Sequence, residues 1–110
     1  MMLNAGKYYH KITIYQTRQV VDEAGFQQTE RQVLLEPYAA VKTTKGMTII
    51  ANNSDFEKAL TRFTIRWPKR ITVTRDMLID FKGKTYAIQY LNNIDEADVE
   101  LEIQAKEVTH

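Results

Sequence analysis

The chain has 110 residues, of which 44% are apolar, and its 15 Lys and Arg nearly balance its 14 Asp and Glu, giving a net charge of +1. This length suits one domain with one core, and the apolar content argues against wholesale disorder. The near-neutral charge argues against a general nucleic-acid binder, and the absence of cysteine excludes disulfides and thiolate chemistry. We therefore expect a single domain over residues 1–110.

No part of the sequence predicts a membrane or export segment. The apolar runs are only a few residues long, too short for a transmembrane helix. Residues 1–7 lack the apolar core of a signal peptide, and we expect them to be a flexible lead-in. These features predict a soluble protein that is made in a cytoplasm.

The first predicted strand covers residues 10–16. It is rich in β-branched residues and sets Ile12 and Ile14 on one face. Residues 21–26 then predict a turn, because Asp and Glu stand at its start and Gly25 can take a positive φ.

A longer extended run follows, at residues 27–42. Its alternation points Val33 and Leu35 toward one face, with Ala39 and Val41 continuing that face. Pro37 cannot donate a hydrogen bond to a neighbouring strand, so the run should bend, bulge or lie at an edge there.

Residues 62–67 form a clean alternating strand that Pro68 ends. Phe63, Ile65 and Trp67 should face the core, while the intervening Arg and Thr residues face outward.

The last third, residues 71–108, predicts a meander of antiparallel strands. Residues 77–81 and 85–90 alternate around a turn at 82–84, with Tyr86, Ile88 and Tyr90 in one phase. After a polar link, residues 99–106 set Val99, Leu101, Ile103 and Ala105 on one face. Together the patterns predict a mainly β fold, a small antiparallel barrel or sandwich of about six strands.

Residues 43–61 form a long loop between the second and third main strands. Ser54 or Asp55 can cap a short helix within it, and one interpretation is a helix that plugs one end of a barrel. We favour the other, a loop that orders against a partner or gates a channel, because long loops in compact domains are usually functional. Its candidate contact residues are Lys45, Met47, Ile49, Ile50, Phe56 and Lys58.

The sequence contains few candidate catalytic residues. His10 and His110 stand in no ligand or triad spacing, and Ser54 has no adjacent base. The acidic residues between Asp95 and Glu102 are the only candidates for a hydrolase, and we interpret them as a polar link and a solvated strand face. We expect no enzyme activity, no cofactor and no metal.

Basic residues gather around Trp67, namely Arg62, Arg66, Lys69 and Arg70. One interpretation is an exposed charged strand edge that discourages edge-to-edge pairing. A second is a surface that lies near DNA or at an interface without gripping it. A third is a small OB-like nucleic-acid-binding module, which would stack bases on an aromatic between phosphate contacts.

The order of these elements resembles the tailed-phage head–tail joining proteins, also called head-closure or head–tail adaptor proteins. The resemblance covers residues 8–108. Its segments are an opening strand and turn at 10–14 and 22–26, an apolar-Ala-x-apolar strand end at 36–41, a variable insertion at 43–60, an alternating strand at 61–67 that begins with Thr and ends in Arg and an aromatic, a turn at 71–77, a G-[KR]-x-[YF]-x-I hairpin at 81–88, and closing strand residues at 101–108. Each segment alone is weak, but their order and spacing together are fairly specific.

This resemblance implies a structural component of a phage or prophage neck. Such a protein connects the DNA-filled head to the tail, assembles as a ring, expected to be dodecameric, under the portal or adaptor, and in some members closes the DNA channel. The implied partners are its own copies, the portal or head-connector protein, a tail-completion protein and passing DNA that is bound without sequence specificity. The implied location is the virion neck, and the host cytoplasm during assembly.

Overall fold

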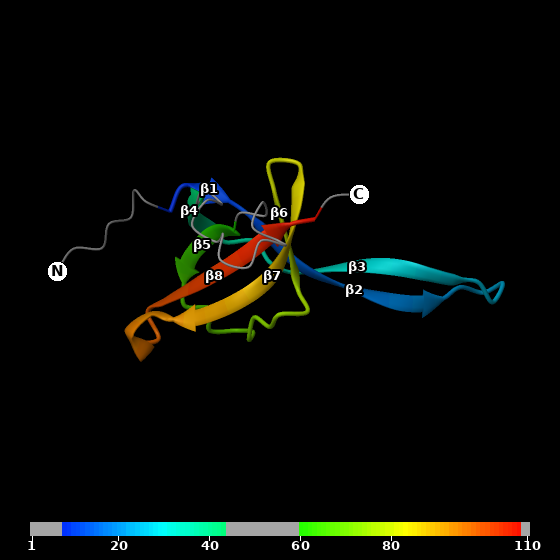
Figure 1. The fold of residues 1–110 in the computed structure, drawn as a ribbon. Helices are drawn as coiled ribbons and strands as arrows, with labels where there is room; N and C mark the ends of the chain where they lie inside the picture. Colours follow the sequence, from blue (N-terminus) through cyan, green and yellow to red (C-terminus); the bar gives the residue numbers. More distant parts are fainter. Residues whose placement is uncertain (1–7, 44–59, 109–110) are drawn as a thin grey trace, which may run out of the picture.

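The computed structural model describes residues 8–43 and 60–108. Within these residues, eight strands form one antiparallel sheet in the order β1-β4-β5-β8-β7-β6-β2-β3, curled into a half-barrel (Figure 1). The strands are β1 (His10–Lys11), β2 (Thr13–Val21), β3 (Gln27–Leu35), β4 (Tyr38–Thr43), β5 (Leu60–Arg66), β6 (Leu78–Phe81), β7 (Lys84–Asn93) and β8 (Glu100–Glu107). The predicted mainly β class is confirmed, with more strands than the six expected.

Helical structure is minor in the described part of the chain. It consists there of a 3-10 turn, η3 (Ile94–Glu96). No helix among the described residues has the length and apolar character needed to span a membrane. The short helix predicted within 43–61 lies outside the described residues.

Ile12 separates β1, at one end of the sheet, from β2, which lies next to the other end. β1 pairs with β4, whereas the start of β2 pairs with β6. The backbone N–H of Ile12 donates to the carbonyl of Pro37 at 3.0 Å. The Ile12 and Ile14 side chains are both buried, so the predicted inward face of the first strand is confirmed.

Pro37 divides the predicted run 27–42 into two strands, β3 and β4. The predicted bend is therefore confirmed, and it sends the two halves to different partners. β3 pairs with β2, while β4 pairs with β1 and β5.

The core fills the inside of the curl and centres on Phe63. Its ring meets those of Tyr86 and Phe81 edge to face, with centroids 5.1 and 5.8 Å away. Phe63 and Ile65 are fully buried as predicted, whereas Trp67 lies beyond the end of β5 and is only partly buried against the core.

Three predicted inward residues face solvent. The register of β7 against β8 shifts between Ile88 and Tyr90, so Tyr90 turns outward and Leu91 packs on the core in its place. Val99 precedes β8 and is 53% exposed. Val33 lies on a part of β3 that projects beyond the core and is 48% exposed.

Candidate functional site

The loop residues predicted to contact a partner or gate a channel lie outside the described residues. They are Lys45, Met47, Ile49, Ile50, Phe56 and Lys58. Their role remains a prediction.

The predicted cation cluster is divided by the fold. β5, which carries Arg62 and Arg66, pairs with β4 on one side and β8 on the other. The interpretation as a charged sheet edge is therefore wrong, because β5 is an internal strand. Arg62 instead has a partner, since its Nε lies 2.7 Å from Oε2 of Glu102. That Nε makes no aligned hydrogen bond, so the contact is a charge pair.

Glu102 is a structural acceptor rather than a solvated charge. The side-chain amides of Asn92 and Gln104 donate to its two oxygens at 3.0 and 2.9 Å. The hydrogen bond from Asn92 is the main cause that holds the pKa of Glu102 below its ordinary value. Gln104 and Arg62 also lower this pKa, whereas burial raises it. The prediction of a solvated face is wrong at this residue. Asp95, Glu96 and Asp98 are exposed in and after η3.

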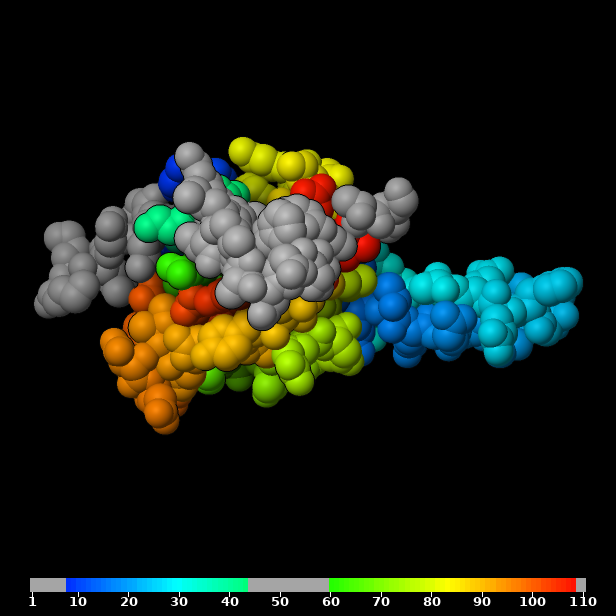
Figure 2. Space-filling view, viewed as in Figure 1, coloured from blue at the N-terminus to red at the C-terminus, as the bar shows by residue number. Residues whose placement is uncertain are grey.

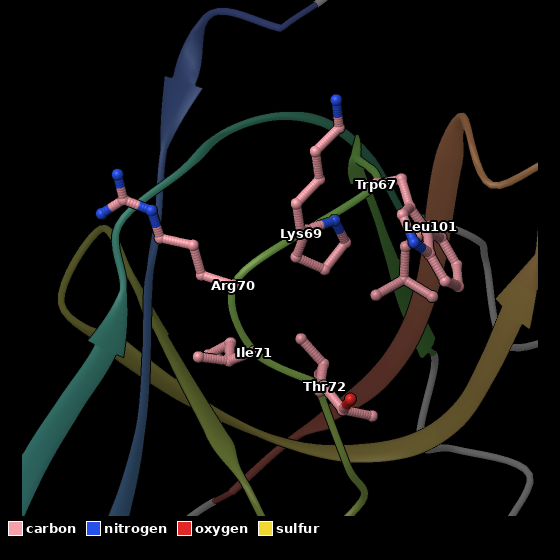
Figure 3. Close-up of a pocket in the computed structure, with 8 residues that line it drawn as sticks. Trp67, Lys69, Arg70, Ile71, Thr72 and Leu101 are labelled. Atoms are coloured by element: carbon pink, nitrogen blue, oxygen red, sulfur yellow. The ribbon is translucent and has the colours of Figure 1, made fainter.

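Arg66, Lys69 and Arg70 remain exposed at the end of β5 and in the connection that follows it. The guanidinium of Arg66 lies 5.5 Å from the centre of the Tyr8 ring. Lys69 and Arg70 stand beside a hollow of about 450 Å³ that the β5–β6 connection forms (Figure 3). We call this the Trp67 hollow; it is lined by Trp67, Pro68, Lys69, Arg70, Ile71, Thr72, Val73 and Leu101.

The Trp67 hollow combines an apolar floor with a basic rim. Val73 and Leu101 are nearly buried at its base, and Trp67 lies next to Leu101 (Figure 3). Lys69 and Arg70 extend from the curved connection (Figure 3). Such a site suits an apolar group that carries negative charge.

A two-stranded arm leaves the body of the sheet. We define it as residues 17–33, the exposed parts of β2 and β3 with the turn between them. Figures 1 and 2 show the arm, in blue and cyan, standing clear of the rest of the molecule. Its cross-strand contacts are polar, such as Arg18 to Glu30 at 3.2 Å and Gln19 to Thr29 at 3.0 Å.

Asp22 organises the tip of the arm. One carboxylate oxygen accepts the N–H groups of Ala24 and Phe26 at 3.0 and 2.9 Å, and the other accepts the amide of Gln28 at 3.0 Å. Gly25 takes the predicted positive φ of 88° and donates to the Asp22 carbonyl. This ordered turn leaves Phe26 69% exposed.

Asp80 of β6 fixes the base of the arm. Its carboxylate accepts hydrogen bonds from the hydroxyls of Tyr15 and Thr85, each at 3.1 Å, and lies 2.7 Å from the guanidinium of Arg31. That guanidinium also lies 3.9 Å from the centre of the Tyr15 ring. Burial is the main cause that raises the pKa of the Tyr15 hydroxyl.

The arm and the Trp67 hollow present apolar and charged groups at the surface. The described residues contain no group of three or more His, Cys, Asp or Glu arranged to hold a metal ion. His10 packs its ring against Phe81, with centroids 5.4 Å apart. Phe26 and the Trp67 hollow provide apolar and charged contacts, which are the kinds of contact by which a protein recognises another macromolecule.

The sequence pattern missed the arm, its tip and its base. One signal was present, because residues 16–19 and 27–32 are polar on both faces, which suits a ribbon that packs on nothing. An apolar Phe26 directly after a turn glycine was a second signal. The contact of Arg31 with Asp80 joins residues far apart in sequence and left no local trace.

The solved structures that share this fold include the following two. The solution structure of protein SF1141 from Shigella flexneri 2a aligns over 98% of this chain and 99% of its own, with a TM-score of 0.71 and 22% identity. A chain from the virion of a native gene transfer agent particle aligns over 91% of this chain and 94% of its own, with a TM-score of 0.57 and 17% identity. No curated protein sequence matches this chain significantly.

A sequence family matches almost the whole length, including the arm and the Trp67 hollow. The family is described as phage head completion protein, and the match runs from residue 3 to residue 108. This agrees with the order of segments that resembles the head–tail joining proteins. The chain belongs to the phage head completion protein family, and its role is structural, at the junction of phage head and tail.

Proposed function

We propose that this protein is a neck component that joins the DNA-filled phage head to the tail, assembling as a ring under the portal or adaptor. The family match over residues 3–108 carries the proposal. The gene transfer agent chain that shares the fold belongs to a virion, which supports a place in an assembled particle. During assembly the protein would reside in the host cytoplasm.

The surfaces of the chain suit ring assembly. A closed ring is built from head-to-tail contacts between two different patches on each subunit. The arm and the Trp67 hollow are two such patches, one protruding and one recessed. We propose a dodecamer, with residues 43–61 docking on a neighbouring component or closing the channel.

The proposed partners are other copies of the chain, the portal or head-connector protein and a tail-completion protein. Packaged DNA would pass through the ring without sequence-specific contacts. The nucleic-acid-binding alternative relies on Arg62 and Trp67 acting together. Arg62 is paired with Glu102 and Trp67 packs partly on the core, so neither is presented as a free stacking or phosphate contact.

Sedimentation tests the proposal. The mass of the protein would be measured alone and after mixing with the head-connector ring and with the tail-completion protein of its own gene cluster. We expect a saturating shift to a ring complex with the connector, lost when residues 45–58 are deleted. The protein alone can remain monomeric, because a templated ring forms only on its template. Absence of co-sedimentation with both partners would contradict the proposal.

A further inference from the structure

We propose that the tip of the arm docks into the Trp67 hollow of a neighbouring copy of this chain. The inference rests on the proposed ring and names the contact that builds it. It follows from three features of the described residues. The tip of the arm is ordered and carries an apolar side chain, the hollow has an apolar floor and a basic rim, and the arm holds the tip away from the hollow of the same molecule.

The tip presents Phe26 in a fixed position. The side-chain carboxylate of Asp22 accepts three hydrogen bonds at the tip. The Asp22 backbone N–H donates to the carbonyl of Phe26, and its carbonyl accepts the N–H of Gly25. Phe26 is nevertheless 69% exposed. A rigid apolar group on an ordered turn binds at low entropic cost, because little freedom is lost on docking. Aromatic anchors of this kind dominate many protein interfaces.

The hollow can receive such a group. Its lining includes Val73 and Leu101, each only 6% exposed, and Trp67 lies beside Leu101 (Figure 3). Its volume of about 450 Å³ falls within the range of sites that bind small organic groups. An apolar centre with a polar rim is the usual anatomy of a protein interface.

The charges of the two surfaces are opposite. Asp22 and Glu23 stand at the tip, and Glu23 is exposed beside the turn. Lys69 and Arg70 are exposed at the hollow, and its lining contains no acidic residue among the described parts of the chain. Asp22 already serves the turn, so Glu23 is the tip charge available to a partner. Opposite charges orient the approach and exclude contacts of two like surfaces.

The arm separates the tip from the hollow of its own chain. The tip lies roughly 20 Å beyond Tyr15, at about 3.3 Å per strand residue. In Figure 1 the arm extends to one side, while the β5–β6 connection crosses the lower edge of the body. Because the tip cannot reach the hollow of its own chain, it can dock only into the hollow of another copy. Such docking is a head-to-tail contact. Coverage by a neighbour also stabilises a two-stranded ribbon, which is marginal when exposed on both faces.

Cysteine pairing tests this contact directly, because the natural chain has no cysteine. Two single-cysteine proteins, Ala24→Cys at the exposed tip, which leaves Phe26 in place, and Lys69→Cys, would be mixed, one carrying a mass tag, and oxidised with and without the head-connector ring. We expect the mixed product to exceed both products of like chains. Lys82→Cys, in the exposed turn after β6, replaces Lys69→Cys as the control and should not form the mixed product.

Charge reversal provides a second readout. Glu23→Lys and Lys69→Glu should each weaken self-association on the connector by about tenfold, and the chain carrying both changes should regain most of the loss. Phe26→Ser should weaken it by about 30-fold, the scale of a central aromatic anchor. Tyr90→Ser removes an aromatic of the body that is 52% exposed and should have little effect.

The outcomes separate this inference from the proposed function. A normal ring with the connector, without the mixed disulfide and with Phe26→Ser unaffected, would overturn the docking contact and leave the neck role intact. A mixed disulfide without connector binding would support the contact and contradict the neck role. Failure of both experiments would overturn both proposals.

Discussion

The guanidinium of Arg31 lies 2.7 Å from the carboxylate of Asp80 and joins the arm to the body of the sheet. Arg31 belongs to β3, which pairs with β2, whereas Asp80 belongs to β6. Apart from this contact, β3 is held to the body by its pairing with β2 and by Leu34 and Leu35 at its end, which pack on the core. The pair therefore helps to set the direction in which the arm points.

Replacing Asp80 should loosen the arm and destabilise the domain modestly. Asp80→Ala removes two hydrogen bonds and one charge pair. Arg31 is about half exposed, so the charge pair itself contributes little, and we expect a loss of about 1–2 kcal/mol of unfolding free energy. Urea unfolding measures this loss, and amide hydrogen exchange in β3 should quicken.

Arg18→Ala is the matched control for Asp80→Ala. It removes the Arg18–Glu30 pair, whose side chains are 58% and 52% exposed and lie within the arm itself. The change in unfolding free energy should stay below about 0.5 kcal/mol. Equal losses for the two variants would show that Asp80 has no special role at the base of the arm.

Phe63 should be the most sensitive aromatic position of the core. It is fully buried and contacts the rings of Tyr86 and Phe81. Phe63→Ala should cost about 3–5 kcal/mol, which is a large share of the stability of a small domain, and Phe63→Leu about 1–1.5 kcal/mol. Denaturant midpoints measure both losses. Tyr90→Ala, at an exposed aromatic, should change the midpoint little, and a comparable loss there would contradict the burial argument.

The sequence correctly predicted the strands in which every second residue is apolar and packs into the core. Phe63 with Ile65, and Leu101 with Ile103, alternate with polar residues, and all four are buried as expected. The hairpin around Gly83 was also readable, because a short connection that contains glycine between two alternating segments indicates a turn. Local pattern was sufficient for these elements.

Other features depend on distant parts of the chain and could not be read locally. Val33 alternates like a core residue, but alternation does not reveal whether a core lies opposite. Tyr90 changes face because of a register shift in β7, which is decided by pairing with β8. The Trp67 hollow brings Leu101 of β8 against the β5–β6 connection, a contact set by the curl of the whole sheet.

The turn between β6 and β7 should respond to residues that favour positive φ. Lys82 and Gly83 have φ of 51° and 78°, as a type I′ turn requires. Lys82→Asn should raise the unfolding free energy by roughly 0.5 kcal/mol, since Asn tolerates this conformation better than Lys. Thermal unfolding measures the gain, seen as a higher Tm.

Gly83→Ala is the opposite change at the same turn. An added Cβ would meet no atom within 4 Å, so the cost is purely conformational. We expect a loss of about 1 kcal/mol. A neutral result at Gly83, or a lower Tm for Lys82→Asn, would show that the turn adopts another geometry in solution.

Glu102 should make stability depend on pH in the acid range. The hydrogen bond from Asn92 is the first cause that lowers its pKa in the folded state, so the unfolded chain binds a proton more readily. The stabilisation is therefore complete above the ordinary pKa of a glutamate and is lost as the pH falls through the lowered value. Unfolding free energies of the natural chain and Glu102→Gln, measured from about pH 6 to about pH 3, should converge toward acid.

Asn92→Ala keeps the carboxylate and removes its principal donor. We expect this variant to lose much of the acid-dependent part of the stability while Glu102 itself remains. If the natural chain and both variants instead fall in parallel as the pH drops, the acid sensitivity arises at other carboxylates. In that case the hydrogen bond between Asn92 and Glu102 does not persist in solution.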